Sequence, residues 1–140
     1  MLFQDKVTIC HFILKIIYMA STFQKGKWGE TLALNWLAQH DFKIIDRNWF
    51  YGHAEIDIIA WHTHVLVFIE VRMLHRNNAH LPENTVSGLK RKKIASAAAA
   101  FTESKHYQGD IRFDIIGIVY DGQHTPEIRH FPDAFFPGLF

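Results

Sequence analysis

The sequence predicts an α/β domain in which a helix, three strands, a second helix and one or two further strands follow one another. Three observations predict this order: apolar residues at helical spacing around residue 32, two strand-like runs between residues 54 and 72, and an alanine-rich helical stretch between residues 85 and 106. The chain has 140 residues, which is enough for one domain with a substantial core.

Composition narrows the class of protein. Apolar residues make up 49% of the chain, which excludes a disordered protein. The net charge is only +1, so any nucleic-acid-binding patch must be local. The lone cysteine, Cys10, excludes a disulfide framework and a cysteine-rich zinc site, and it fits a cytoplasmic protein.

The first 21 residues differ in composition from the rest of the chain. Lys15 and His11 interrupt their apolar run, which argues against a signal peptide and against a membrane span. We therefore expect residues 1–21 to be an N-terminal extension, residues 22–140 to form a single domain, and the membrane to be no partner.

The first helix is expected from Lys25 to His40. Glu30 lies in its first turn on these bounds, where an acid is favoured by the helix dipole. Two strands then run from Asp41 to Ala60 and reverse at Gly52 and His53. Arg47 lies in the first of these strands, as a surface residue unless the functional site is close by.

Four charged side chains interrupt two strands that otherwise look buried. The run from Val65 to Val71 is apolar on both strand faces, which indicates a central strand covered on each side. Burying an unpaired carboxylate costs several kcal/mol, so such groups are usually paired or bound to metal. Residues two apart on a strand share a face, which groups Glu55 with Asp57 and Glu70 with Arg72.

The turn between these strands decides whether the acids meet. A turn of two or four residues in the break at 61–64 puts Asp57 and Glu70 on one face, directly opposite in the four-residue register and diagonal in the two-residue register. Carboxylates that close repel, and Mg²⁺ or Mn²⁺ would relieve the repulsion. The alternative is a structural ion pair of Glu70 with Arg72 at the strand end, with Glu55 and Asp57 facing solvent on an edge.

The second helix is expected from Thr85 to His106, after a polar loop that follows Arg72. Its first half carries four consecutive cations, Lys90, Arg91, Lys92 and Lys93. Two or three of them could line a groove that meets phosphates, although a charge run is more often a solvated helix face.

The last elements are a strand from Asp110 to Tyr120, with Arg112 and Asp114 on one face, and a short strand from Pro126 to Phe131. The aromatic tail from residue 133 is expected to pack onto the body. His62 and His64 lie in the predicted hairpin turn without a third ligand in view, so we interpret them as surface residues rather than a zinc site.

An acid at the end of one strand followed by acid-x-basic on the next is similar to the PD-(D/E)xK nuclease motif. The chain resembles the YraN-like family of predicted endonucleases, within the restriction-endonuclease-like superfamily that also contains archaeal Holliday junction resolvases. The resemblance spans roughly residues 25–136 and rests on GETLALNWL (Gly29 to Leu37), IIDRNWFYGHAEIDIIA (Ile44 to Ala60), VFIEVR (Val67 to Arg72), VSGLKRKKI (Val86 to Ile94), RFDIIGI (Arg112 to Ile118) and IRHFPDAF (Ile128 to Phe135).

The resemblance implies an αβββαβ core with a mixed central sheet flanked by helices. It also implies that Asp57 and Glu70 bind the catalytic metal with help from the Val71 carbonyl, and that Glu30 is a further acid reaching the site. Resolvases of the superfamily cut as dimers, which makes a homodimer possible here. The chain departs from the family pattern at Ala54, where glycine is usual, and at Arg72, where lysine is usual.

The function expected from the sequence is metal-dependent hydrolysis of DNA, selective for branched or junction structures because no element for reading bases is found. Asp57 and Glu70 would hold Mg²⁺ or Mn²⁺, and Arg72 would stabilise the transition state. The residues expected to contact the DNA backbone are Lys90, Lys92, Lys93 and Arg47, and Glu55 has a supporting role. The alternatives are a DNA-binding or assembly module of the same fold that has lost catalysis, and a purely structural protein.

Overall fold

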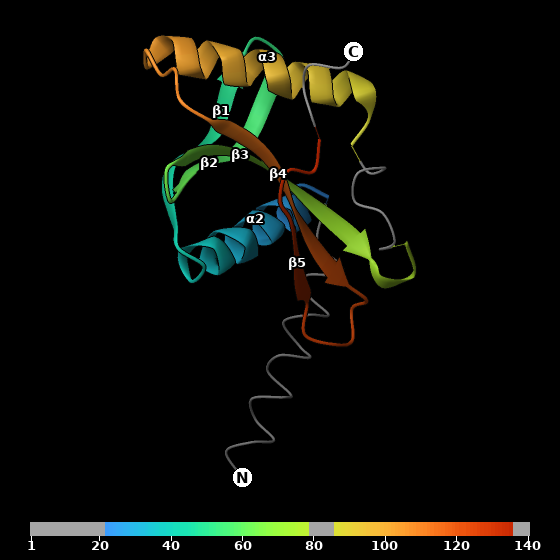
Figure 1. The fold of residues 1–140 in the computed structure, drawn as a ribbon. Helices are drawn as coiled ribbons and strands as arrows, with labels where there is room; N and C mark the ends of the chain where they lie inside the picture. Colours follow the sequence, from blue (N-terminus) through green and yellow to red (C-terminus); the bar gives the residue numbers. More distant parts are fainter. Residues whose placement is uncertain (1–21, 79–85, 136–140) are drawn as a thin grey trace.

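The computed structural model describes residues 22–78 and 86–135 and arranges them as a five-stranded sheet between two helices (Figure 1). The elements in chain order are α2 (Thr22–Ala38), β1 (Phe42–Tyr51), β2 (Ala54–His62), β3 (Val65–His75), the short 3₁₀ helix η1 (Arg76–Asn78), α3 (Gly88–Ser104), β4 (Ile111–Tyr120) and β5 (Glu127–Phe131). The predicted order of elements is confirmed.

The sheet is mixed, as the resemblance implied. Its strand order is β1-β2-β3-β4-β5, and only β3 and β4 run parallel to one another. A parallel pair needs a crossover connection, which the segment containing α3 supplies. Figure 1 shows α3 on one side of the sheet and α2 on the other.

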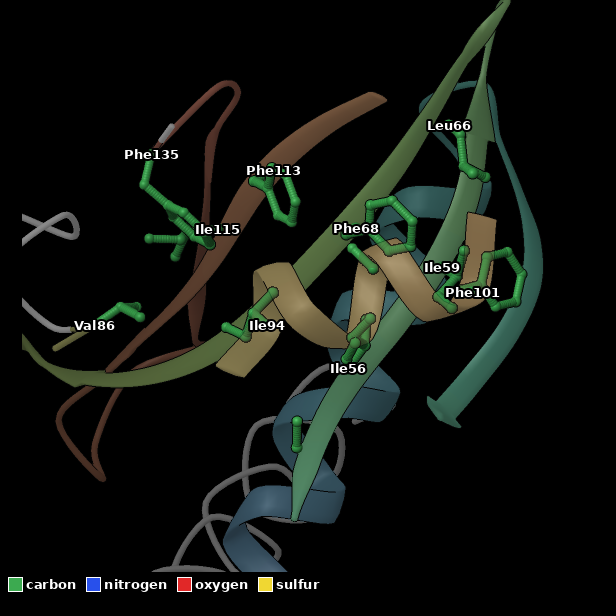
Figure 2. Packing of buried hydrophobic residues seen from close by; sticks show 13 residues of the cluster. Ile56, Ile59, Leu66, Phe68, Val86, Ile94, Phe101, Phe113, Ile115 and Phe135 are labelled. Carbon is green, nitrogen blue, oxygen red and sulfur yellow. The ribbon is translucent and has the colours of Figure 1, made fainter. Parts of the chain in front are cut away.

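Each face of the sheet has its own hydrophobic core. On the α3 side, Phe68 lies 6.0 Å from Phe101 and 5.5 Å from Phe113 between ring centroids, and Figure 2 shows these rings beside Ile56 and Ile59. On the α2 side, the cluster is formed by Ala33, Leu37, Phe42, Ile58, Ala60, Val67, Ile69, Ile116 and Ile118. The centre of β3 is therefore buried on both faces, as its continuous apolar run predicted.

Both helices begin at positions that differ from the predicted ones. The helix α2 begins at Thr22, so Glu30 lies well inside it, and the expected first-turn position of Glu30 is wrong. The helix dipole therefore does not explain this acid. The helix α3 begins at Gly88, because the Ser87 side chain accepts a hydrogen bond from the Lys90 N–H at 3.2 Å and caps the first turn.

Two-residue turns close both hairpins. Gly52 and His53 connect β1 to β2, as predicted, and Gly52 takes a φ of 58°. Thr63 and His64 connect β2 to β3. The prediction that His62 lies in the turn is wrong, because β2 continues through it and its ring stacks on Phe42 at 4.1 Å.

The ends of the described chain also refine the predictions. The strand β3 continues past Arg72 to His75, since Leu74 is buried and pairs with Val119, so the expected end at Arg72 is wrong. Phe135 packs on Phe113 with 5.2 Å between ring centroids, which confirms tail packing at that residue. The predictions for residues 1–21 and 136–140 lie outside the described residues. No helix among those described is long and apolar enough to cross a membrane.

Candidate active site

The strands β2 and β3 stop pairing at the two predicted metal ligands. Their pairing runs from His62 opposite Val65 to Ile58 opposite Ile69, and one further step would set Asp57 opposite Glu70. In this register the two-residue turn, and not a four-residue turn, would set Asp57 and Glu70 directly opposite one another. The difference from the prediction arises because β2 extends further than expected, to His62. Where the pairing ends, the Val71 N–H donates to Asp57 Oδ2 at 2.8 Å.

The inward and outward alternation of β2 breaks at Asp57. Ile56 packs in the α3-side core, whereas Ile58 packs in the α2-side core, so these two residues do not share a face. The prediction that Glu55 and Asp57 share a face stays a prediction, because the break lies between Ile56 and Ile58. The neighbouring strand is irregular at the same level, because Asn48, which lies between the pairs of β1 with Ile58 and Ile56, has a φ of 50°.

Asn48 ties two of the remaining acids to one another. Its Nδ2 donates to Glu30 Oε2 at 3.1 Å and to Glu55 Oε1 at 3.3 Å. Asn48 therefore links Glu55 to Glu30, and the supporting role of Glu55 at the metal site stays a prediction. We did not single out Asn48 from the sequence, and the only signal it offered was the tolerance of asparagine for a positive φ.

Glu70 is a buried carboxylate with one satisfied oxygen. It is 3% exposed, and its Oε1 lies 2.7 Å from Lys90 Nζ and 3.7 Å from Arg72 Nη1. Its Oε2 is the only buried side-chain nitrogen or oxygen among the described residues that has no hydrogen-bond partner. Buried polar atoms are nearly always paired, so this oxygen requires an explanation.

Asp57 is held in a setting that disfavours its charge. Burial and then the negative charge of Glu70 raise its pKa from 3.8 to about 8, and Glu30 adds a smaller contribution in the same direction. The Val71 N–H and the positive charge of Lys90 oppose the rise but do not cancel it. Burial and the neighbouring acids therefore favour the protonated form of Asp57 when no other cation is present.

These donors suit a hard divalent cation with few protein ligands. Mg²⁺ is commonly bound by one or two carboxylates with water and phosphate oxygens completing the shell, and Asp57 with Glu70 supplies that number. Within residues 22–78 and 86–135, no three His, Cys, Asp or Glu side chains gather closely enough to hold a metal by themselves. Val71 presents its N–H to Asp57, and the predicted role of its carbonyl stays a prediction.

The lysines of α3 lie beside the β1–β2 turn. Lys90 and Lys93 line a hollow of about 310 Å³ together with Glu55 and Ser87. Lys92 and Lys93 line a second hollow of about 260 Å³, which shares His53 and Ala54 with the first. Arg47 is exposed in β1 at the position opposite Ile58. The predicted contacts of these cations with DNA stay predictions.

A second buried carboxylate, Asp114 of β4, is fully satisfied. It accepts hydrogen bonds at 2.7 Å from Arg112 Nε and Nη2 and from His130 Nε2, and one at 3.0 Å from the Asp133 N–H. Burial opposes ionisation, but these hydrogen bonds outweigh it and hold the pKa of Asp114 below its usual value. The pairing of Arg112 with Asp114 agrees with the prediction that they share a strand face. The hydrogen bond between His130 and Asp114 was not predicted.

Fold and site together define a mixed α/β domain with an acidic pair where two central strands separate and a row of lysines beside it. The chain belongs to the family described as Uncharacterised protein family UPF0102, whose model matches residues 29–118. This confirms the family resemblance seen in the sequence, while the nuclease activity implied by that resemblance is taken up below as a proposal.

Relatives at moderate identity cover most of the chain, and each carries the name UPF0102 protein. The chain is 40% identical to one from Cytophaga hutchinsonii over 103 residues, 74% of this chain and 89% of the relative. It is 37% identical to one from Anaeromyxobacter dehalogenans over 111 residues, 79% of this chain and 82% of the relative. It is 35% identical to one from Bacteroides thetaiotaomicron over 122 residues, 87% of this chain and the whole of the relative.

Proposed function

We propose that the protein is a metal-dependent nuclease that hydrolyses DNA phosphodiesters, with Asp57 and Glu70 as ligands for Mg²⁺ or Mn²⁺. The observation that carries the proposal is that the buried Glu70 Oε2 has no partner. The negative charge of Glu70 also helps to raise the pKa of Asp57 to about 8. A cation between the two acids would satisfy the free oxygen and remove the repulsion.

The residues around the acids suit phosphate chemistry. A bound Mg²⁺ would polarise the phosphodiester and lower the pKa of a bound water. Asp57 would release its proton as the metal arrives, while the Val71 N–H fixes Oδ2. Lys90 and Arg72 both approach Glu70 Oε1, so their charges are placed to offset the negative charge that develops on an attacked phosphate. Arg72 stays protonated and is not a proton acceptor.

The substrate follows from the surroundings of the acids. Lys92 and Lys93 would hold the DNA backbone beside the site, a contact that carries no sequence information. We therefore propose that the protein selects branched or junction DNA structures and not a particular sequence. We also propose that it is cytoplasmic and can act as a homodimer.

The test is a cleavage assay on linear, flapped and four-way DNA with Mn²⁺, Mg²⁺ or EDTA. The wild-type chain should cut in Mn²⁺ or Mg²⁺ but not in EDTA, and Asp57→Asn and Glu70→Gln should each lower the rate by about a hundredfold or more. Asp46→Asn is the matched control, because Asp46 is an exposed acid of the neighbouring strand. Equal cleavage by all four proteins would indicate a contaminating nuclease and contradict the proposal.

One observation favours a second candidate, a DNA-binding module without catalysis. Arg72 stands 3.7 Å from Glu70 with 36% of its side chain exposed, and it cannot be tuned by losing its proton as a lysine can. Binding of the same DNA substrates by wild type, with no cleavage in any metal, would support this candidate over the nuclease.

A further inference from the structure

The tip of the β1–β2 hairpin exposes two aromatic side chains. Phe50 is 62% exposed and Tyr51 is 54% exposed, although aromatic rings are usually buried where they can contribute most to stability. Tyr51 lies two residues from Trp49 and therefore on the same face of β1, the face that packs against α3. Trp49 contacts Phe101 of α3 edge-on at 5.4 Å.

The Tyr51 ring is oriented by its neighbour. Its plane is within 8° of the Trp49 plane, with 6.5 Å between the ring centroids. Since Trp49 packs against the α3-side core, the Tyr51 ring lies parallel to an anchored ring while more than half of the residue is exposed. Phe50, by strand alternation, points to the other face of β1 and lines neither of the two hollows.

Two lysines of α3 line the same hollow as this ring. Tyr51 lines the hollow of about 260 Å³ with His53, Lys92 and Lys93. The hollow of about 310 Å³ shares His53 and Lys93 and continues to Lys90, whose Nζ lies 2.7 Å from Glu70 Oε1. The two hollows are adjacent, because they share His53, Ala54 and Lys93, and together they are here called the Tyr51 channel. Its link to the proposed metal ligands is Lys90, which pairs with Glu70.

An exposed ring among lysines matches one kind of polyanion. Single strands bind to aromatic platforms flanked by cations, because every base has a face that can stack and every nucleotide carries a phosphate. The bases of an intact duplex are already stacked and paired, so a duplex offers the lysines its phosphates but offers the ring no base. An acidic peptide would satisfy the lysines and leave the ring unused.

We propose that the Tyr51 channel binds a single-stranded segment of DNA, with one base stacked on Tyr51 and the backbone held by Lys92 and Lys93. This inference rests on the proposed function and deepens it, because it names the unpaired arm of a branched substrate as the part that is recognised. A strand that follows the channel from Tyr51 to Lys90 has its next phosphates beside Glu70.

Binding is measured without metal, so the result does not depend on cleavage. Fluorescence anisotropy in EDTA would compare a labelled oligothymidylate of about ten nucleotides with a duplex of the same length. The variants are Tyr51→Ala, Tyr51→Phe and Lys93→Ala. The matched controls are Phe50→Ala, an equally exposed ring outside the channel, and Lys43→Ala, an exposed lysine of the same strand.

Tyr51→Ala should weaken single-strand binding about tenfold and leave duplex binding nearly unchanged, whereas Tyr51→Phe should keep wild-type affinity because the ring is retained. Lys93→Ala should reduce the salt slope by about 0.7, one single-strand phosphate contact. Phe50→Ala and Lys43→Ala should bind like wild type.

Three results would overturn the inference: equal losses for Tyr51→Ala and Phe50→Ala, no loss for Tyr51→Ala, or tighter binding of the duplex than of the single strand. A chain that binds single strands as expected but cuts no DNA would refute the proposed nuclease and leave the channel standing.

Discussion

Two buried carboxylate sites lie on neighbouring strands of one sheet and differ in how well they are satisfied. Asp114 of β4 accepts four hydrogen bonds and faces Arg112 and His130. Glu70 of β3 has one close cation, Lys90, and an oxygen without a partner. The pKa of Asp114 is lowered, whereas that of Asp57, beside Glu70, is raised to about 8.

The difference fits a structural role for Asp114 and the proposed metal-binding role for Asp57 and Glu70. A carboxylate that serves only the fold is surrounded until its charge is stabilised, as at Asp114. The pair of Asp57 and Glu70 is destabilised as it stands, because two acids share a partly buried place with too few donors. Such an arrangement is understandable where a cation completes it, and functional sites commonly contain groups with raised pKa values for this reason.

The comparison predicts opposite effects of neutralising the two acids. Asp114→Asn should lower the free energy of unfolding by about 3–5 kcal/mol, because Arg112 would lose its partner in a half-buried place. Asp57→Asn should leave the metal-free stability unchanged or raise it, since it removes the cost of holding an ionisable carboxyl in a buried acidic place. Urea unfolding at neutral pH in EDTA measures both, and a large loss for Asp57→Asn would contradict the contrast.

The pH dependence of stability should separate the sites. The folded-state pKa of Asp57 lies above its usual 3.8. The stability that Asp57 contributes is therefore fully present below pH 3.8 and is lost as the pH rises toward about 8. The pKa of Asp114 is lowered in the folded state. The stability that Asp114 contributes is therefore present above the usual pKa of an aspartate and is lost as the pH falls through the lowered pKa. Metal-free wild type should lose stability between about pH 5 and about pH 8, and Asp57→Asn should lose less. Identical profiles for the two proteins would contradict the assignment.

Lys90 should matter to the fold through Glu70. Lys90→Ala removes the cation 2.7 Å from a buried carboxylate and should cost about 1.5–3 kcal/mol, the usual worth of a hydrogen bond to a charged group. Lys93→Ala is the matched control on the same helix, and as an exposed position it should stay within about 0.5 kcal/mol. Equal small effects in thermal unfolding would mean that Lys90 does not stabilise Glu70.

Arg72 should have the smallest effect on stability and a measurable one on chemistry. At 3.7 Å from Glu70 and 36% exposed, Arg72→Ala should cost less than about 1 kcal/mol. In Mn²⁺-dependent cleavage of a four-way junction, Arg72→Ala should lose activity, whereas Arg72→Lys should keep or raise it because the smaller ammonium leaves room for a water. An early-melting Arg72→Ala with unaltered cleavage would make Arg72 a structural partner only.

Much of this site could be predicted because charge stands out inside an apolar run. Asp57, Glu70 and Arg72 were identified in this way, and the hairpin parity that places Asp57 near Glu70 depends only on counting residues. The central position of β3 also followed from its local apolar pattern, whereas the mixed sheet was implied by the family resemblance.

The remaining features depend on contacts between distant parts of the chain. Lys90 reaches Glu70 only because α3 packs across β3, and no local pattern separates Lys90 from its three cationic neighbours. The break in alternation between Ile56 and Ile58 lies beside an irregularity at Asn48 in the adjacent strand, and strict period-two counting predicts neither. The first-turn assignment of Glu30 failed because α2 begins at Thr22, before the stretch whose apolar spacing indicated the helix, and periodicity alone does not fix helix ends.

The most direct test of the central claim is calorimetric titration of Mn²⁺ into the protein at pH 7 in two buffers that differ in ionisation enthalpy. A cation shared by Asp57 and Glu70 must displace the proton of Asp57, so wild type should bind one Mn²⁺ and release close to one proton, and Glu70→Gln should do neither. The control variant Asp114→Asn, measured at a temperature where it is folded, should still bind Mn²⁺. Absence of Mn²⁺ binding by wild type, or the same binding and proton release by Glu70→Gln, would contradict the claim that these two acids form a metal site.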